Sequence, residues 1–199
     1  MKQFLAITAL ALCLAACSSE PSDAPDSAST VSNESAAAPA PPSAPEAPQP
    51  PPATPAANVL TLDGLGALRI GQPVPASSGW AERGAQISES CRTVSSSEFP
   101  GVYAIVEDNK VRRITIGNNS DVKLIEGIGV GASEAEVRSA FPGFRETPHK
   151  YSEAPAKYLT APNAESGDPA LRFEIGRDGK VSLVHIGTMP VLGYVEGCA

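Results

Sequence analysis

The expected fold is decided by residues 103–117, which read YAIVEDNKVRRITIG, and residues 173–187, which read FEIGRDGKVSLVHIG. Aligned without gaps, the two stretches are identical at Ile105/Ile175, Asp108/Asp178, Lys110/Lys180, Val111/Val181, Ile116/Ile186 and Gly117/Gly187. A segment that recurs within one chain indicates a supersecondary unit that is built twice. We therefore expect the two stretches to adopt the same local structure.

Each stretch is predicted to form a β-hairpin. Asp108-Asn109 and Asp178-Gly179 are typical of two-residue type I′ turns, whose central residues both need positive φ. With these turns, alternation predicts a core face made of Tyr103, Ile105, Ile114 and Ile116 in the first hairpin and Leu171, Phe173, Ile175, Val184 and Ile186 in the second. The other face is mixed, and it holds Val106, Val111, Arg113 and Thr115 in one hairpin and Arg172, Glu174, Leu183 and His185 in the other.

A helix is predicted before the second hairpin. Ser133 and Glu136 form a capping-box pattern, and Val137, Ala140 and Phe141 follow as one apolar stripe. The corresponding residues 75–83 contain a central glycine and no capping box, so any helix there should be shorter. We thus expect an α+β domain of two repeated units, residues 58–120 and 121–199, each a short helix packed on antiparallel strands.

The N-terminus has the features of an export signal. Residues 1–16 carry Lys2 and then an apolar run that is too short to span a bilayer. Residues 14–17 (LAAC) resemble the lipobox of bacterial lipoproteins; the alternatives are an ordinary cleaved signal peptide or a membrane helix. The resemblance implies that Cys17 is lipidated and becomes the first residue of the mature protein. It also implies, from Ser18, an outer-membrane lipoprotein whose domain faces the periplasm.

Residues 17–57 are predicted to form a disordered linker. They consist mostly of Ala, Pro and Ser and contain almost no apolar side chain that would favour folding. The formal net charge of the chain is −7, and no basic patch is evident. This composition argues against nucleic-acid binding and leaves the lipid anchor as the expected link to the membrane.

Two cysteines remain in the domain, Cys91 and Cys198. An even pair in an exported protein is most simply a structural disulfide, here closing a loop of about a hundred residues. The chain has no CxxC motif and no histidine at ligand spacing, so neither a metal nor another cofactor is predicted.

No motif predicts catalysis. The chain has two histidines, His149 in a predicted loop or strand start and His185 within a predicted strand. No serine lies in a GxSxG motif, and the glycines of residues 127–131 lack the spacing of a dinucleotide-binding loop. We therefore predict that the protein is not an enzyme, with no catalytic residues.

A second resemblance bears on function. Residues 128–137 (IGVGASEAEV) are similar to the start of the helix in the BamE and β-lactamase-inhibitor-like α/β fold. Members of such families are exported binding modules, either outer-membrane assembly lipoproteins or inhibitors that grip a target with an open sheet face. The resemblance implies a similar fold over residues 58–199 and a protein partner in the cell envelope.

The sequence therefore predicts a non-catalytic protein-binding module, either an inhibitor of an envelope hydrolase or an assembly factor. The two hairpins differ at their outward positions, so the predicted binding surface consists of Arg113, Thr115, Arg172, Glu174 and His185. Tyr151 and Tyr158 are predicted interface anchors. The alternatives are a structural envelope lipoprotein without a discrete site and, least favoured, a hydrolase that uses His149 or His185.

Overall fold

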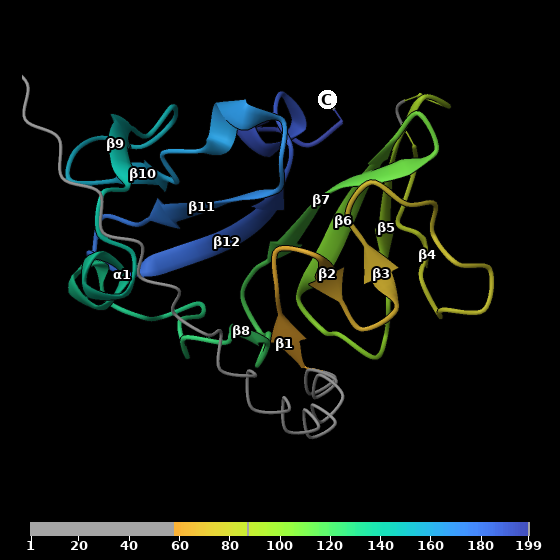
Figure 1. The fold of residues 1–199 in the computed structure, drawn as a ribbon, viewed down its shortest axis with the longest axis horizontal. Helices are drawn as coiled ribbons and strands as arrows, with labels where there is room; N and C mark the ends of the chain where they lie inside the picture. The colour runs from red at the N-terminus through yellow and green to blue at the C-terminus, as the bar shows by residue number, and fades with distance from the viewer. Residues whose placement is uncertain (1–57, 87, 199) are drawn as a thin grey trace, which may run out of the picture. The chain divides into compact units, whose positions relative to one another are not determined.

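An eight-stranded antiparallel sheet is the framework of the described part of the chain (Figure 1). The computed structural model describes residues 58–86 and 88–198. In spatial order the strands are β4 (Ala81–Glu82), β5 (Cys91–Ser95), β6 (Val102–Glu107), β7 (Lys110–Ile116), β12 (Val181–Gly187), β11 (Ala170–Ile175), β10 (Lys157–Thr160) and β9 (Arg145–Pro148). The predicted signal peptide, Cys17 and the linker lie outside the described residues.

Shorter elements surround the sheet. They are β1 (Val59–Leu60), β2 (Gly64–Leu65), β3 (Leu68–Arg69), β8 (Lys123–Leu124), α1 (Glu134–Ala140) and the 3-10 turns Ala164–Ser166 and Val191–Gly193. Strand β1 pairs in parallel with β8, and β2 pairs with β3 in antiparallel. Among the described residues, none of the helical segments has the length and apolar character needed to cross a membrane.

The expected α+β class with two helix-on-strand units is wrong. Within residues 58–86 and 88–198 the fold is mostly β and contains a single α-helix, in the second half. In the first half, residues 75–78 form a turn closed by the Ser78 N–H and the Pro75 carbonyl (3.1 Å), and β4 follows. Gly79 has a φ of 70°, which lies outside the range of a right-handed helix, so a helix cannot continue through this residue.

Helix α1 begins where the sequence predicts. The Glu136 N–H donates to Ser133 Oγ at 3.3 Å, and the Ser133 N–H donates to Glu136 Oε2 at 2.7 Å. This reciprocal capping box satisfies two of the backbone donors that a helix start leaves free. Val137 is the buried residue of the helix and joins the main core.

The first hairpin turn is confirmed. Asp108 and Asn109 both have positive φ, at 52° and 60°, as a two-residue type I′ turn requires. Glu107 faces Lys110 across the turn. The hairpin of β6 and β7 is thus connected as its sequence predicts.

The second hairpin turn differs from the prediction. The Gly179 N–H donates to the Gly176 carbonyl at 3.0 Å, and the Gly176 N–H donates to the Lys180 carbonyl at 2.8 Å. Gly176, rather than Arg177, therefore faces Lys180. Gly179 has a φ of 72°, whereas Asp178 accepts the Lys180 N–H on its side chain at 3.1 Å. This is a three-residue loop that ends in a left-handed glycine.

A bulge changes the faces of the first hairpin. Ile105 pairs with Arg113 but Val106 pairs with Val111, which leaves Arg112 as an extra residue in β7. One extra residue moves the side chains beyond it to the opposite face. The inward and outward alternation of side chains in β7 is therefore reversed on passing Arg112.

The face prediction for the first hairpin is wrong at four positions. Val106 and Val111 belong to the main core, together with the correctly predicted Ile114 and Ile116. Tyr103 and Ile105 lie instead on the face of Arg113, and Ile105 joins a separate buried cluster. For the second hairpin the predicted core face is confirmed, with Leu171, Phe173, Ile175, Val184 and Ile186 all in the main core.

The two hairpins join through β7 and β12. Thr115 lies opposite His185, and the neighbouring pairs are Ile114 with Ile186 and Ile116 with Val184. In the aligned stretches Ile114 corresponds to Val184 and Ile116 corresponds to Ile186. Across the sheet, however, Ile114 pairs with Ile186 and Ile116 pairs with Val184. The hairpins are related by an approximate two-fold axis at this pair, and no element lies between them.

The close approach of β7 and β12 predicts a strong effect of Gly187→Ala. A Cβ at Gly187 would collide with the Arg112 carbonyl oxygen, whereas a Cβ at Gly117 would meet the flexible Leu183 side chain at 3.2 Å and the Gly101 carbonyl oxygen at 3.4 Å, an ordinary contact distance. We expect Gly187→Ala to lower the free energy of unfolding by about 3 kcal/mol and Gly117→Ala by less than about 1 kcal/mol. Urea denaturation of both variants checks this, and equal losses would contradict it.

Candidate functional site

The five residues of the predicted binding surface do come together, but three of them, Arg113, Thr115 and His185, are buried, and Arg172 and Glu174 are partly buried. Thr115 is fully buried, and Arg113 and His185 are 1% and 2% exposed. Arg172 pairs with His185 across the β11–β12 ladder, and Glu174 lies two residues further along β11. These side chains form a polar network inside the protein, so the expected open sheet face is closed at this point.

The C-terminal segment, residues 188–198, covers this network. The Arg113 guanidinium donates to the Val191 carbonyl oxygen at 3.2 Å and to the Tyr194 carbonyl oxygen. Val191 is buried in a cluster with Ile105 and Cys91. A buried guanidinium needs acceptors that replace water; two carbonyls of the covering segment accept from Arg113 Nη1, whereas Arg113 Nε has no hydrogen-bond partner among the described residues.

The covering segment ends at the predicted cysteine pair. Cys91 and Cys198 are confirmed as a disulfide-capable pair, with Cα atoms 5.6 Å apart and bridge geometry in the structure. The Tyr194 hydroxyl donates to Glu107 Oε1 at 3.2 Å. The segment is therefore held to β5, β6 and β7 as well as to β12, from which it emerges.

Both histidines of the chain contact one carboxylate. His185 Nε2 lies 3.2 Å from Glu174 Oε1, and His149 Nε2 lies 3.3 Å from Glu174 Oε2. On its other side, His185 Nδ1 lies 2.9 Å from Thr115 Oγ1. The sequence gives no sign that His149, 25 positions from Glu174, joins this network.

The hydrogen bonds determine which ring nitrogens carry protons. His149 Nδ1 faces the N–H groups of Tyr151 and Ser152, each at 3.1 Å, and must accept from both. Burial lowers the pKa of His185 to about 4, and the charge of Arg113 adds to this effect. At neutral pH His185 is therefore neutral, accepting from Thr115 on Nδ1 and donating to Glu174 from Nε2.

Glu174 is the anion of the network. Burial opposes its ionisation, but the hydrogen bonds from His185 and His149 outweigh burial and hold the pKa of Glu174 below its usual value. The Arg172 guanidinium lies 4.0 Å from the Tyr158 ring centroid, and His149 stacks on the same ring at 4.7 Å. Tyr158 is thus buried within the network and is not free to act as the predicted interface anchor.

The order Thr115, His185, Glu174 has the connectivity of an activated nucleophile. A nucleophile must reach a substrate, however, and the Thr115 hydroxyl is fully buried in this structure. Within the described residues, no three His, Cys, Asp or Glu side chains are grouped to hold a metal ion. The geometry of these residues therefore suits a structural network that fastens the C-terminal segment to the sheet.

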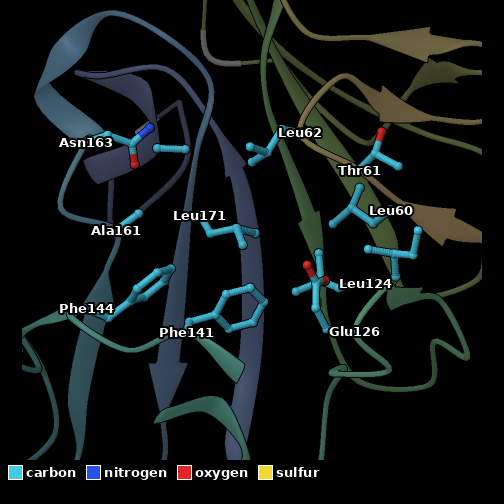
Figure 2. Close-up of a pocket in the computed structure, with 12 residues that line it drawn as sticks. Leu60, Thr61, Leu62, Leu124, Glu126, Phe141, Phe144, Ala161, Asn163 and Leu171 are labelled. Atoms are coloured by element: carbon cyan, nitrogen blue, oxygen red, sulfur yellow. The ribbon is translucent and has the colours of Figure 1, made fainter. Parts of the chain in front are cut away.

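A pocket that the sequence did not predict is the second candidate site (Figure 2). It has a volume of about 420 Å³. Its walls are mainly apolar, formed by Leu60, Leu62, Leu124, Ile125, Phe141, Phe144, Ala161, Ala170 and Leu171, with Thr61, Glu126 and Asn163 as the polar members. In Figure 2 Leu60 and Leu124 stand across the pocket from Phe141 and Leu171.

The rim of this pocket is unusually apolar for an exposed surface. Leu62 is 45% exposed and Ile125 is 77% exposed, and both line the pocket. They are two of the three large hydrophobic residues that are exposed in the described part of the chain, the third being Tyr151. Exposed apolar side chains gathered at a concave site are typical of an interaction surface.

Separate segments of the chain build the pocket. Its walls come from β1 and the turn after it, from β8 and the turn after it, from the segment after α1, from the segment after β10, and from β11. Phe141 and Phe144 contact each other, with ring centroids 5.3 Å apart, and both contact Phe173 of the core. In the sequence, the sign of this pocket is the pair Phe141 and Phe144 on either side of Pro142 and Gly143. Aromatic residues are also common in protein cores, so the pair alone does not predict a pocket.

The protein is predicted to lose stability in acid through His185. Its folded pKa of about 4 lies below the ordinary value of 6.5, so the unfolded chain binds a proton that the native state excludes. The stabilisation is complete above pH 6.5 and decreases by about 3 kcal/mol as the pH falls to 4. Urea denaturation at several pH values checks this.

The control for this pH dependence is His185→Gln. The variant keeps Glu174, whose lowered pKa also costs stability in acid, but only as the pH falls through and below the usual range of a carboxyl. The slope between pH 6.5 and 5 should therefore disappear in the variant. A slope that persists would show that another group titrates in this range.

The disulfide is predicted to hold the covering segment in place. We expect the Cys91→Ser/Cys198→Ser double variant to lose about 3 to 5 kcal/mol of stability, because the bridge spans 107 positions. Hydrogen exchange should accelerate most at Leu192 and Tyr194, whose N–H groups bond within the segment. Two titratable thiols at these positions in protein purified without reductant would contradict the bridge.

Comparisons with known proteins give no match: no protein-family model, no curated protein and no solved structure is similar to the chain. The similarity of residues 128–137 to the BamE and β-lactamase-inhibitor-like fold stays a prediction.

Proposed function

We propose that the protein is an envelope lipoprotein whose domain binds a protein partner through the apolar pocket. The lipobox-like residues 14–17 support an anchor at Cys17, and Ser18 supports placement in the outer membrane with the domain facing the periplasm. The composition of residues 17–57 supports a linker that lets the domain work away from the membrane surface. As an inhibitor or an assembly factor, such a domain needs an exposed recognition site.

The observation that carries this proposal is the exposed apolar rim of the pocket. Leu62 and Ile125 remain in contact with water in the free domain, although each would be stabilised by burial at about 25 cal/mol per Å² of apolar surface. Protein interfaces commonly gain most of their affinity from a few large side chains that fill a pocket on the partner. The pocket supplies such a receptor site, and Leu62 and Ile125 supply apolar contacts at its edge.

The network of Arg113, Thr115, Arg172, Glu174 and His185 is less suited to this role. A partner would have to displace the C-terminal segment and leave Arg113 without its carbonyl acceptors. An uncompensated buried charge costs several kcal/mol. We therefore propose the pocket, rather than this network, as the binding site.

The chemistry of the pocket favours binding over catalysis. Among its lining residues, Glu126 alone has an ionisable side chain, and the lining includes no histidine, cysteine, serine or lysine. Acid–base and nucleophilic catalysis both require a second group within hydrogen-bond reach. This composition supports a non-catalytic site.

Capture of the partner from the envelope tests the proposal. We expect the full-length lipidated protein to retain a stoichiometric partner after mild solubilisation, and Leu62→Asp or Ile125→Asp to reduce recovery at least tenfold, because a carboxylate would be desolvated at the interface. Quantitative mass spectrometry of the captured material measures this.

The matched control is Tyr151→Asp, which also tests the prediction that Tyr151 is an interface anchor, because binding through the pocket does not involve this residue. This residue is 59% exposed and does not line the pocket, so the substitution should leave recovery unchanged. Equal losses in all three variants, or no partner with the unaltered protein, would contradict the proposal. The second result would favour a structural envelope lipoprotein without a discrete site.

A further inference from the structure

We propose that the partner presents a basic residue beside the apolar side chain that enters the pocket, and that this residue pairs with Glu126. The inference rests on the proposed function and specifies the chemistry of the partner. The partner segment is a short peptide stretch with one or two bulky apolar side chains next to Lys or Arg.

Glu126 is held at the pocket by its local turn. It follows β8 in a turn that the Gly127 N–H closes by donating to the Leu124 carbonyl at 2.9 Å. Gly127 takes a φ of 80°, a conformation that favours glycine. The turn therefore brings Leu124, Ile125 and Glu126 to one wall of the pocket, with the carboxylate beside apolar surface.

The Glu126 carboxylate has no internal cation. Within the described residues it forms no ion pair, whereas Glu134, Glu146 and Glu174 pair with cationic or imidazole groups of the domain. The pocket lining contains no Lys, Arg or His that would neutralise it. Glu126 is exposed, so its carboxylate would repel an incoming anion and attract an incoming cation at the rim of the pocket.

Asn163 provides a second polar group. Figure 2 shows it on the wall opposite Glu126, with its amide directed toward the pocket. Its side chain makes no hydrogen bond to the described residues, and it does not cap the 3-10 turn that follows it. An amide both donates and accepts hydrogen bonds, so it can bind the backbone of an extended peptide.

The size of the pocket limits the occupant. Its volume of about 420 Å³ lies near the lower end of the range for ligand sites, roughly 300 to 1,000 Å³. One or two large side chains fit this space, whereas the whole face of an amphipathic helix needs a long groove. The apolar walls, the single carboxylate and the facing amide together define a basic-apolar peptide as the matching ligand.

Three synthetic peptides test this inference. Each is acetylated, amidated and fluorescently labelled, with a central Phe-Leu pair flanked by lysines, by glutamines or by glutamates. The protein is the chain from Ser18 onward, which keeps the complete linker and the compact unit that contains residues 58–199. We expect fluorescence anisotropy to give about tenfold tighter binding of the lysine peptide than of the glutamate peptide, with the difference shrinking as salt is added.

Charge variants identify the group responsible. Glu126→Gln should bring the three affinities to within about twofold of one another, and Glu126→Lys should reverse their order. Leu62→Asp should weaken all three peptides, while Tyr151→Asp should leave all three unchanged. A reversed preference on charge reversal is a result that general destabilisation cannot produce.

Failure of this inference is distinguishable from failure of the proposed function. Equal binding of the three peptides, dependent on Leu62, overturns the role of Glu126 but leaves the pocket as a protein-binding site. Binding of no peptide overturns the inference, and capture from the envelope then decides the function. Tighter binding of a neutral apolar dye such as N-phenylnaphthylamine than of any peptide, lost in Leu62→Asp, would assign the pocket to small amphiphiles and overturn both.

Discussion

The pairing of β7 with β12 is the constraint on which the rest of the structure depends. It joins two four-stranded halves, which are otherwise built from separate parts of the chain, into one sheet. The contact is close enough that Gly187 has no room for a side chain. At its centre lies a polar pair, Thr115 and His185, so hydrogen bonding as well as apolar packing specifies the register.

That polar pair explains why a charged network lies inside the domain. His185 needs an acceptor for Nε2–H, which Glu174 provides, and the burial of Glu174 is compensated by hydrogen bonds from His185 and His149. Arg113 in turn needs carbonyl acceptors, and the C-terminal segment supplies them. A buried polar group that loses its partners is costly, so the network and the covering segment, which supplies two acceptors to Arg113, are interdependent.

Local signals in the sequence predict part of this structure and miss the rest for identifiable reasons. The capping box at Ser133 and the turn at Asp108 and Asn109 depend on short-range chemistry, and the cysteine pair follows from there being two cysteines in the domain; the structure agrees with all three. The bulge at Arg112 has no distinctive residue to mark it, so the faces of β6 were misassigned. The convergence of the five outward residues was predicted, but the burial of Arg113, Thr115 and His185 and the presence of the pocket were not, because both arise when distant segments meet.

The position of β1 has a mechanical consequence. This strand has only two residues, follows directly on the predicted linker and is held by β8, and Leu60 within it forms part of the pocket wall. If the chain is anchored at Cys17 as proposed, tension between the anchor and the domain would enter at Val59 and load the short β1–β8 pair first. The eight-stranded sheet and its disulfide lie further along the chain, so a pulling force would deform the pocket before it strained the framework.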